Sequence, residues 1–520
     1  MEFRSHDGTG NSLADASVNA TDTAFMRMGA PHFADESRGL VDGPNPRVVS
    51  NTVVGEGHAE AANPQGLSGM MYAWGQFIDH DFNLTVDSRN MGKPIDVVVP
   101  DDDPQFPPGI VIPMTRAQVD ANGDPINAVT GWLDASMVYG STAELAAKLR
   151  QEDGTMRTSE GDNLPLAEID PTGEDTSENE GRLPGHLAGD GRADENPSLT
   201  ALHTLFVREH NHQVARLHEA DPCLTGDQLY DQARAIVIAE IENVTYAEFL
   251  PHLLGDRMIE DYEGHDEDVD PRMAIEFAGA AYRWGHSTVS PHTEKLDEAG
   301  EPAGESSLAD AFFQSPEVFA ADGGADGMLR HLAADLAQAM DVRIVGDLRN
   351  FLFDPPVGLD LASVNIQRGR DLGLPHLNDM REELSLARHA DFDEITSDAA
   401  TVAALRETYG DVDRIDLWTG GLAEEVDAGF LGETFGVIVA DQFARLRDGD
   451  RLWWENQGFD DESLQAVRET SLSDIILRNT DTQVLQEDVF TFYERRPADA
   501  EPEEPDSPQL IVESDALGLA

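Results

Sequence analysis

Cysteine and long apolar runs are nearly missing from this chain. Its 520 residues include one cysteine, Cys223. A single thiol can form neither an internal disulfide nor a CxxC metal site, so neither holds the fold together. No apolar stretch approaches the roughly 18 residues that read as a membrane-spanning helix. The first residues also lack the basic and apolar regions of a signal peptide, so we expect no membrane span and see no leader.

Lysine is equally scarce and occurs only at Lys93, Lys148 and Lys295. Aspartate and glutamate number 100 against 35 lysines and arginines, which gives a net charge of −65. Nucleic acid and anionic membranes are therefore excluded as partners, because phosphates need basic patches. Self-repulsion of this size destabilises a fold at low salt but keeps it soluble. We expect a salt-adapted source, although a preference for arginine over lysine accounts for part of the pattern.

The chain reads as mainly α, with one large helical domain, long loops and little β-structure. Residues 1–62 are rich in Asn, Gly and Pro and predict an irregular wrapping arm, residues 63–496 the catalytic domain, and residues 497–520 an acidic, disordered tail. Apolar spacing of three and four predicts helices over 67–82, 195–220, 226–249, 272–285, 327–341, 399–408 and 461–470.

The stretch "WGQFIDHDF" places a histidine between two carboxylates in an apolar helix. Gln76, Asp79 and His80 share one face, because residues three and four apart are neighbours on a helix. Asp81 lies about 200° around the helix from Asp79. The two carboxylates cannot serve one small site, so this helix is expected to lie between two sites.

A second oxygen-rich stretch is "TGWLDAS", in which Thr130, Asp134 and Ser136 fall at even spacing. In an extended segment these side chains point to one side. Together with a backbone carbonyl and Asp81 they would form an all-oxygen cage, which suits Ca²⁺. Taken alone, such a pattern more often marks a polar turn or strand edge.

Histidines elsewhere have plain structural interpretations. His286 ends the stretch "AAYRWGHS", with Arg283 one turn earlier, and a lone histidine there is more often a core residue than a ligand. His203, His210 and His212 do not match a usual zinc spacing, so a structural role is favoured for them over a metal site.

Six motifs in this order resemble those of the animal-type haem peroxidases of the peroxidase–cyclooxygenase superfamily. They are "WGQFIDHD", "TGWLDASMVYGS", "GDGRADENPSLTALHTLFVREHN", "YRWGH", "LDLASVNIQRGRDLGLP" and "LRDGDRLWWEN". The resemblance extends from about Asn63 to Arg496, and the first sixty residues also look like the arm of family members. We expect a microbial member of this family.

The resemblance implies a role for each matching residue. The distal catalytic residues would be His80, Arg192 and Gln76, and the proximal iron ligand His286, which would donate a hydrogen bond to Asn365. Asp79 and Glu195 would be able to form esters with the haem, and Arg283 and Arg368 would also lie at the cofactor. Calcium would be held by Asp81, Thr130, the Trp132 carbonyl, Asp134 and Ser136.

The resemblance also implies an activity. Hydrogen peroxide would oxidise a b-type haem, with or without ester links, and the haem would then oxidise a halide, a pseudohalide or a small organic donor such as a phenol. His80 would act as general base and then acid, and Arg192 would stabilise charge in the breaking O–O bond. One mammalian member carries a methionine after the ester glutamate, whereas Asn196 stands here, so no sulfonium link can form. The disulfides of the mammalian members are absent too.

Two other functions fit the same motifs. Fatty-acid dioxygenases of the superfamily use a tyrosine three residues before the proximal histidine, but Arg283 occupies that position and Tyr282 lies one residue further away. A non-catalytic, haem-bearing adhesion protein would have no need of Gln76, His80 and Arg192. The sequence favours a peroxidase over both. A Ca²⁺ site and an acidic surface favour an exported protein.

Overall fold

Helices dominate the computed structural model of the chain, which describes residues 2–55, 62–86, 94–167, 185–257, 259–353 and 357–492. The predicted acidic tail lies outside these residues. The strands that they contain form two-stranded antiparallel sheets: β1 (Thr23–Ala24) with β4 (Ile126–Asn127), β2 (Val97–Val98) with β3 (Val111–Ile112), β5 (His292–Leu296) with β6 (Pro302–Ser307), β7 (Phe351–Phe353) with β8 (Val357–Leu359), and β9 (Val426–Ala428) with β10 (Leu431–Gly432). The expected fold, mainly α with little β-structure, is confirmed.

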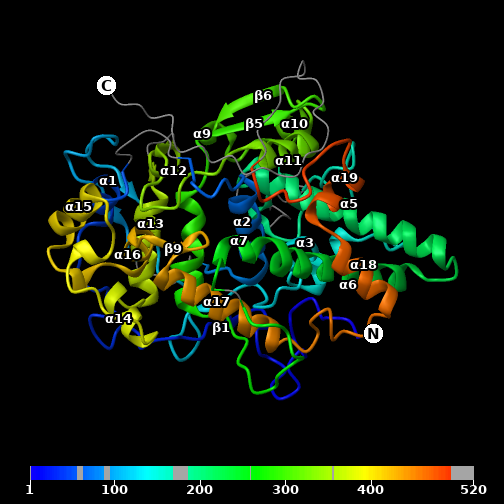
Figure 1. Cartoon of the computed structure of the whole chain (residues 1–520), viewed down its shortest axis with the longest axis horizontal. Helices are drawn as coiled ribbons and strands as arrows, with labels where there is room; N and C mark the ends of the chain where they lie inside the picture. Colours follow the sequence, from blue (N-terminus) through cyan, green and yellow to red (C-terminus); the bar gives the residue numbers. More distant parts are fainter. Residues whose placement is uncertain are drawn as a thin grey trace, which may run out of the picture.

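Four helices build the centre of the molecule: α2 (Met70–Phe82), α5 (Pro197–Ala220), α6 (Gly226–Val244) and α11 (Gly324–Ala334). α2 lies in the middle, with α5 and α6 extending to the right in Figure 1. α5 packs against both α6 and α11. The core rings on α2, Trp74 and Phe77, are fully buried and contact Phe206 on α5. Burial of such side chains stabilises each by roughly 1.5–3 kcal/mol.

The remaining helices complete both halves of the molecule (Figure 1). They are α1 (Pro46–Thr52), α3 (Ser136–Tyr139), α4 (Ala143–Leu149), α7 (Leu250–Leu254), α8 (Ile275–Gly279), α9 (Leu308–Ala311), α10 (Pro316–Ala320), α12 (Gly346–Arg349), α13 (Leu361–Leu372), α14 (Leu377–Glu383), α15 (Ala399–Tyr409), α16 (Leu417–Ala423), α17 (Glu433–Asp448), α18 (Asp461–Glu469) and α19 (Leu472–Asn479). Short 3₁₀ turns occur at η1 (Gly191–Asp194), η3 (Ala281–Ser287), η4 (Phe392–Glu394) and η5 (Val412–Arg414), and a π turn at η2 (Thr245–Phe249).

The amino-terminal arm is tied to the body along much of its length. Arg4 is buried and pairs with Glu242 and Asp450, and β1 pairs with β4. Arg47 forms buried ion pairs with Asp103 and Asp360. The arm is less irregular than expected, because Asn45 caps α1, and because Val49, Val53 and Val54 join the main core.

Two predicted helices differ from the structure. The segment predicted over 272–285 divides into α8 and η3, because Ala280 takes φ −141° and ψ −66°, which no α-helix accommodates. The helix predicted over 327–341 begins at Gly324 and ends at Ala334. Its chain then extends to exchange backbone hydrogen bonds with residues 67–69 before α2. Pairing with a distant segment therefore overrides the local apolar spacing.

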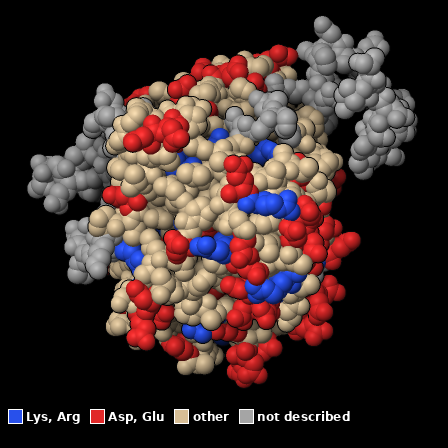
Figure 2. All heavy atoms as spheres, turned by 90° about the vertical axis from the view of Figure 1, so that its left-hand side faces the viewer, with Lys and Arg blue, Asp and Glu red and all other residues tan. Residues whose placement is uncertain are grey.

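The surface reflects the composition. Asp and Glu greatly outnumber Lys and Arg on the face shown in Figure 2, in agreement with the net charge of −65. None of the helices in the described part of the chain has the length and apolarity needed to cross a membrane.

Candidate haem site

Helix α2 lies between two polar centres, as its sequence predicts. On one side the Asp79 carboxylate accepts a hydrogen bond from Asn83. On the other side Asp81 Oδ2 accepts hydrogen bonds from the backbone N–H groups of Asp134 and Ala135, each 2.9 Å long. The two carboxylates therefore belong to separate environments, and His80 lies between them in sequence.

His80 is buried and neutral. Its side chain is on the last turn of α2, and only 3% of the residue is exposed. Burial, reinforced by the Arg192 charge, holds the pKa of the imidazole well below its usual range. Its Nδ1 atom is buried without a hydrogen-bond partner among the described residues. A neutral imidazole can accept a proton, which an imidazolium cannot.

Arg192 approaches the same point from η1. Its Nη2 donates to the His80 carbonyl at 3.2 Å and its Nη1 to the Asn83 carbonyl at 3.1 Å. The Asp190 carboxylate accepts hydrogen bonds from Nε and Nη2 of this guanidinium, both 2.8 Å long. Burial would raise the pKa of Asp190, but the attraction of Arg192 outweighs it and lowers that pKa below the usual range. A fixed positive charge therefore lies beside His80.

Gln76 is held one turn before His80 by two residues at the start of α5. Its Nε2 donates to Glu195 Oε2 at 3.3 Å, and its Oε1 accepts from Asn196 Nδ2 at 3.1 Å. Asn196 also caps α5 by accepting from Leu199 N at 3.0 Å. Asn196 thus both begins α5 and orients the Gln76 amide, which in turn contacts Glu195.

Asp79 is a carboxyl group in unusual surroundings. Burial raises its pKa to about 7, although Arg192 and Arg283 both act in the opposite direction. About half of the molecules therefore carry a protonated Asp79 near pH 7. Arg192, Asp79 and Arg283 influence one another electrostatically, so the distal residues and the segment before His286 meet at this carboxyl.

His286, Arg283 and Asn365 form a hydrogen-bonded chain. Arg283 Nη1 donates to Asn365 Oδ1 at 2.7 Å, and Asn365 Nδ2 lies 2.8 Å from His286 Nδ1. The pairing of His286 with Asn365 is as expected, but its direction is reversed. Because Arg283 occupies the amide oxygen, Asn365 presents its NH₂ group, and the histidine nitrogen accepts.

The His286 imidazole is desolvated but keeps part of its surface accessible. Burial is the main cause that lowers the pKa of His286 to about 4, so the imidazole is neutral, as a metal ligand must be. His286 and Gly285 nevertheless keep accessible surface. A Cβ added at Gly285 would meet no atom within 4 Å. A neutral and partly accessible imidazole has the properties that a metal ligand requires.

Arg368 lies on α13, as Asn365 does, and is largely buried. Its Nη1 donates to the Thr115 carbonyl at 3.0 Å and to Asp371 Oδ2 at 2.8 Å. Its charge also lowers the pKa of Arg283, after the larger effect of burial on that group. Arg368 therefore adds positive charge near Arg283, although its Nη1 is directed to Asp371.

The predicted calcium residues converge on Asp81. Ser136 Oγ donates to the Asp81 carbonyl at 2.6 Å, and Thr130 Oγ1 donates to Asp134 Oδ1 at 2.9 Å. Asp81 Oδ1 and Asp134 Oδ2 are buried oxygens with no hydrogen-bond donor among the described residues. Burial raises the pKa of both carboxyls, that of Asp134 to about 6, and Asp134 raises that of Asp81 further. Trp132 is anchored through Nε1 to the Gly8 carbonyl in the arm, at 3.2 Å.

Several residues of this centre were not predicted. Asp190 fixes Arg192, Asn83 pairs with Asp79, and Asn196 orients Gln76. Asp190 was recognisable in principle, because an acid two residues before an arginine at a helix start can cap and pair at once. The structural role predicted for His210 is confirmed, since it bonds Tyr139 and the Gly154 carbonyl.

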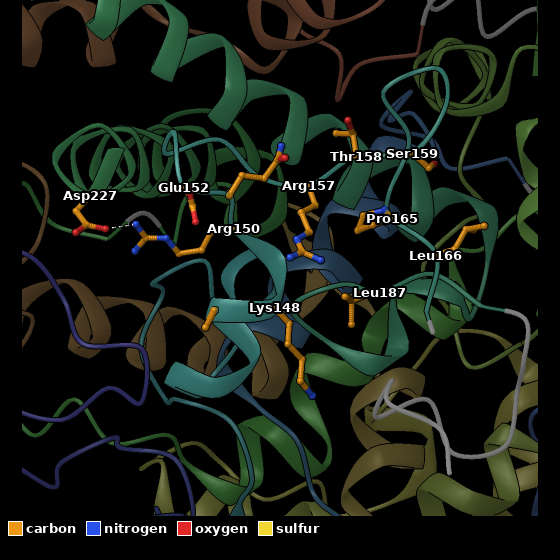
Figure 3. Close-up of a pocket in the computed structure, with 12 residues that line it drawn as sticks. Lys148, Arg150, Glu152, Arg157, Thr158, Ser159, Pro165, Leu166, Leu187 and Asp227 are labelled. Atoms are coloured by element: carbon orange, nitrogen blue, oxygen red, sulfur yellow. Dashed lines mark hydrogen bonds and ion pairs between the residues drawn. The ribbon is translucent and has the colours of Figure 1, made fainter. Parts of the chain in front are cut away.

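A surface hollow lies elsewhere. It has a volume of about 1270 Å³ and is lined by α4, the segment after it, Leu187 and Asp227. Figure 3 shows Lys148, Arg150 and Arg157 around it, with Arg150 paired to Asp227. None of the residues predicted for the haem or calcium sites lines it.

Three comparisons with known proteins agree. Residues 3–490 match the family described as animal haem peroxidase. The chain is 34% identical to a peroxidasin homolog of Mus musculus, over 94% of this chain but only 37% of that protein. It is 35% identical to the eosinophil peroxidase of Mus musculus, over 85% of this chain and 68% of that protein. The chain thus spans little more than a third of its peroxidasin relative.

A solved structure shares the fold. Peroxidase A from Dictyostelium discoideum has a TM-score of 0.85 and 29% identity, with 94% of this chain and all of that chain covered. This family is named for its haem cofactor. The chain belongs to the animal haem peroxidase family.

Proposed function

We propose that this protein is a haem peroxidase that uses hydrogen peroxide to oxidise halides, pseudohalides or small organic donors such as phenols. The observation that carries the proposal is that His80 is buried and neutral, and that the Arg192 guanidinium donates a hydrogen bond to the His80 backbone carbonyl. A proton acceptor with a positive charge nearby is what cleavage of a peroxide bond requires. Membership of the family supports the same function.

The haem would be held by His286 through Nε2. A neutral imidazole that binds iron through Nε2 carries its proton on Nδ1, so Asn365 would have to turn its oxygen towards His286. Arg283 would then release that oxygen. Two arginines, Arg283 and Arg368, would supply positive charge for the haem carboxylates. The chemistry that haem supplies when bound is the reduction of peroxide and the oxidation of a donor.

His80 and Arg192 would act on the peroxide. The imidazole of His80 accepts the proton of the incoming peroxide oxygen and returns it to the leaving oxygen as water forms, first as base and then as acid. The Arg192 guanidinium stabilises negative charge that develops along the O–O bond. Gln76 contributes an amide whose orientation Glu195 and Asn196 set, and it helps to position the oxygen near His80.

Asp79 and Glu195 would form ester links to the haem. An ester is uncharged, and the raised pKa of Asp79 shows that its surroundings disfavour the carboxylate. Glu195 lies beside Gln76, within reach of the same space. After turnover with peroxide, haem should therefore stay attached to the denatured protein, and loss of all haem to acid–acetone would refute the links.

Calcium would be the second cofactor. Two buried carboxylates, each with one oxygen that lacks a donor among the described residues, require a cation for neutralisation. Asp81, Asp134, Thr130, Ser136 and the Trp132 carbonyl offer oxygen ligands of the kind that Ca²⁺ prefers. Because Asp81 and His80 are adjacent, the ion would fix the end of α2 that carries His80.

Stopped-flow spectroscopy tests the proposal. The haem-loaded protein should show a rapid change in the haem spectrum with peroxide, followed by recovery with bromide, iodide or a phenol. His80→Ala should slow the first reaction about 10²- to 10⁴-fold while haem remains bound. His212→Ala, an exposed histidine on α5, is the matched control. An unchanged rate in His80→Ala would refute the role of His80, and absence of any reaction in the wild type would refute the function.

The alternative functions find less support. A dioxygenase would need a tyrosine where Arg283 donates to Asn365, and Tyr282 is instead stacked on Phe277 with a ring-centroid distance of 4.5 Å. The exported location expected from the sequence stays a prediction, as do the identity of the donor and the division into arm, catalytic domain and tail.

A further inference from the structure

A second group of histidine and carboxylate side chains lies outside the proposed haem and calcium sites. It joins His32 in the amino-terminal arm to His376 and Asp379 at the beginning of α14. One ligand-capable atom from each of the three residues lies within 4.8 Å of the others. The two imidazole rings meet edge to face, with centroids 4.5 Å apart and an interplanar angle of 79°.

Both histidines have ring nitrogens in positions that suit metal binding. Each ring carries a nitrogen that lies close enough to the other two ligand atoms to share one ion. His32 Nδ1 is buried and has no hydrogen-bond partner among the residues that the structure describes. A buried polar atom without a partner is unfavourable, so a ligand that binds it stabilises the fold.

The charges around the group favour a cation. Arg388 bonds Asp379 at 3.0 Å, Glu382 at 2.9 Å and Asp413 at 2.9 Å, so three carboxylates share one guanidinium. Two imidazoles and a carboxylate, surrounded by this excess of negative charge, can bind a divalent ion.

We propose that His32, His376 and Asp379 bind a divalent transition-metal ion of the Zn²⁺ type. Nitrogen and carboxylate ligands suit Zn²⁺, and a tetrahedral site takes them at about 2.0–2.1 Å from the metal. Ligand atoms would then lie roughly 3.4 Å from one another, so small side-chain rotations complete the site. A water molecule would occupy the fourth position.

The ion would fasten the arm to the half of the protein that carries Asn365. The arm already touches this region, since His32 N donates to the Gly373 carbonyl at 2.9 Å, directly after α13. The Phe33 ring covers Gly373, where a Cβ would lie only 2.3 Å from it. His32 and His376 are far apart in sequence, and an ion that binds both of them in the folded but not in the unfolded chain stabilises the fold by mass action.

Calorimetric titration of the full chain with Zn²⁺ tests the proposal, in buffer that keeps Ca²⁺ in excess. One Zn²⁺ per chain should bind, and it should raise the melting temperature. His32→Ala, His376→Ala and Asp379→Asn should each weaken binding at least about 10-fold, by analogy with the 10- to 100-fold effect of losing even an outer-sphere partner. The measurement needs neither haem nor peroxide, so it stands apart from the proposed function.

Glu382→Gln is the matched control, because it removes a carboxylate from the same helix and from the same arginine without removing a ligand. Circular dichroism of each metal-free variant verifies that it folds. Equal weakening in Glu382→Gln and Asp379→Asn would show that only the general negative charge attracts Zn²⁺, and the site would be wrong. Binding that persists in the His32→Ala, His376→Ala double variant would also overturn it.

Discussion

The Asp190 carboxylate binds the Arg192 guanidinium at two points, with Nε–Oδ1 and Nη2–Oδ2 both 2.8 Å long. The Asp190 side chain is 4% exposed and that of Arg192 18% exposed. This paired geometry fixes the plane of the guanidinium, which a single hydrogen bond would not do. The backbone N–H of Arg192 also donates to Asp190 Oδ1 at 2.8 Å. Asp190 is thus a positioning residue for the charge beside His80.

Replacing Asp190 should therefore slow the reaction with peroxide. In Asp190→Ala the guanidinium is free to leave the His80 carbonyl, and misplacement of a reacting group by about 1 Å can cost about 10²-fold in rate. We expect a loss of that order in stopped-flow measurements, with unchanged haem content. Asp190→Asn, which keeps one acceptor, should lose less. Arg192→Ala should show the largest loss of rate, because it removes the charge itself. A wild-type rate in Asp190→Ala would show that Asp190 is not needed to position Arg192.

Local signals account for much of the fold. α5 begins where Asn196 and Pro197 place it. The loop 130–136 lies at Asp81 as predicted, but its backbone bends and Ala135 is left-handed, so the expected extended segment is wrong. What the sequence could not provide depends on distant contacts. α11 ends early because its chain pairs with residues before α2. The orientation of the Asn365 amide is set by Arg283, a partner from another element.

Asn365→Asp should lower the reduction potential of the bound haem iron. A carboxylate can accept from Arg283 and from His286 Nδ1–H at the same time, whereas the amide has one oxygen for both. A stronger acceptor makes the imidazole a more basic ligand, which stabilises the oxidised iron. Spectroelectrochemical titration measures the shift. Asn365→Ala, which removes the acceptor, should shift the potential upwards, and equal potentials in all three proteins would contradict the chain of hydrogen bonds.

Asp134→Asn should have opposite effects on stability with and without calcium. Without the ion, the substitution removes repulsion between two buried carboxylates and should raise the melting temperature. With Ca²⁺ at 100 times its dissociation constant, the wild type gains about 2.7 kcal/mol, and the variant gains less because it lacks a charged ligand. Calorimetry of both proteins, in calcium and in chelator, tests whether the order of their melting temperatures reverses. Asp261→Asn, at an exposed position, is the control and should show no such reversal.

Asp335 should make stability fall as pH rises from about 4 to 7. Burial raises its pKa to about 7 from an ordinary value of 3.8, although the Tyr72 hydroxyl donates to it. Between these values the folded state holds a proton that the unfolded chain has released, so the free energy of unfolding decreases with pH. The full shift corresponds to about 4 kcal/mol at most, and partial exposure reduces it.

Asp335→Asn removes this titration while keeping an acceptor for Tyr72. Relative to the wild type, the variant should gain stability between pH 4 and 7 and differ little at pH 4. Urea unfolding at several pH values measures the difference. Asp42→Asn, whose side chain is fully exposed, serves as the control. A constant difference across this range would mean that Asp335 titrates normally.

Monovalent salt should stabilise the fold independently of calcium. The net charge of −65 is spread over a surface on which acidic side chains dominate (Figure 2). Raising ionic strength from about 0.1 to 1 M shortens the Debye length from about 10 to 3 Å, which screens repulsion between surface carboxylates. The melting temperature should therefore rise with KCl in the wild type and in Asp134→Asn alike.

Screening can be separated from other salt effects by its dependence on ionic strength. KCl and K₂SO₄ at equal ionic strength should act similarly if screening dominates, whereas exclusion of sulfate from the protein surface would make K₂SO₄ more effective. The same field repels anionic donors, so the oxidation rate of iodide should increase with ionic strength more than that of a neutral phenol. A melting temperature that stays constant over this range would show that the acidic surface does not influence stability. Equal salt dependence for iodide and phenol would show that it does not influence the approach of the donor.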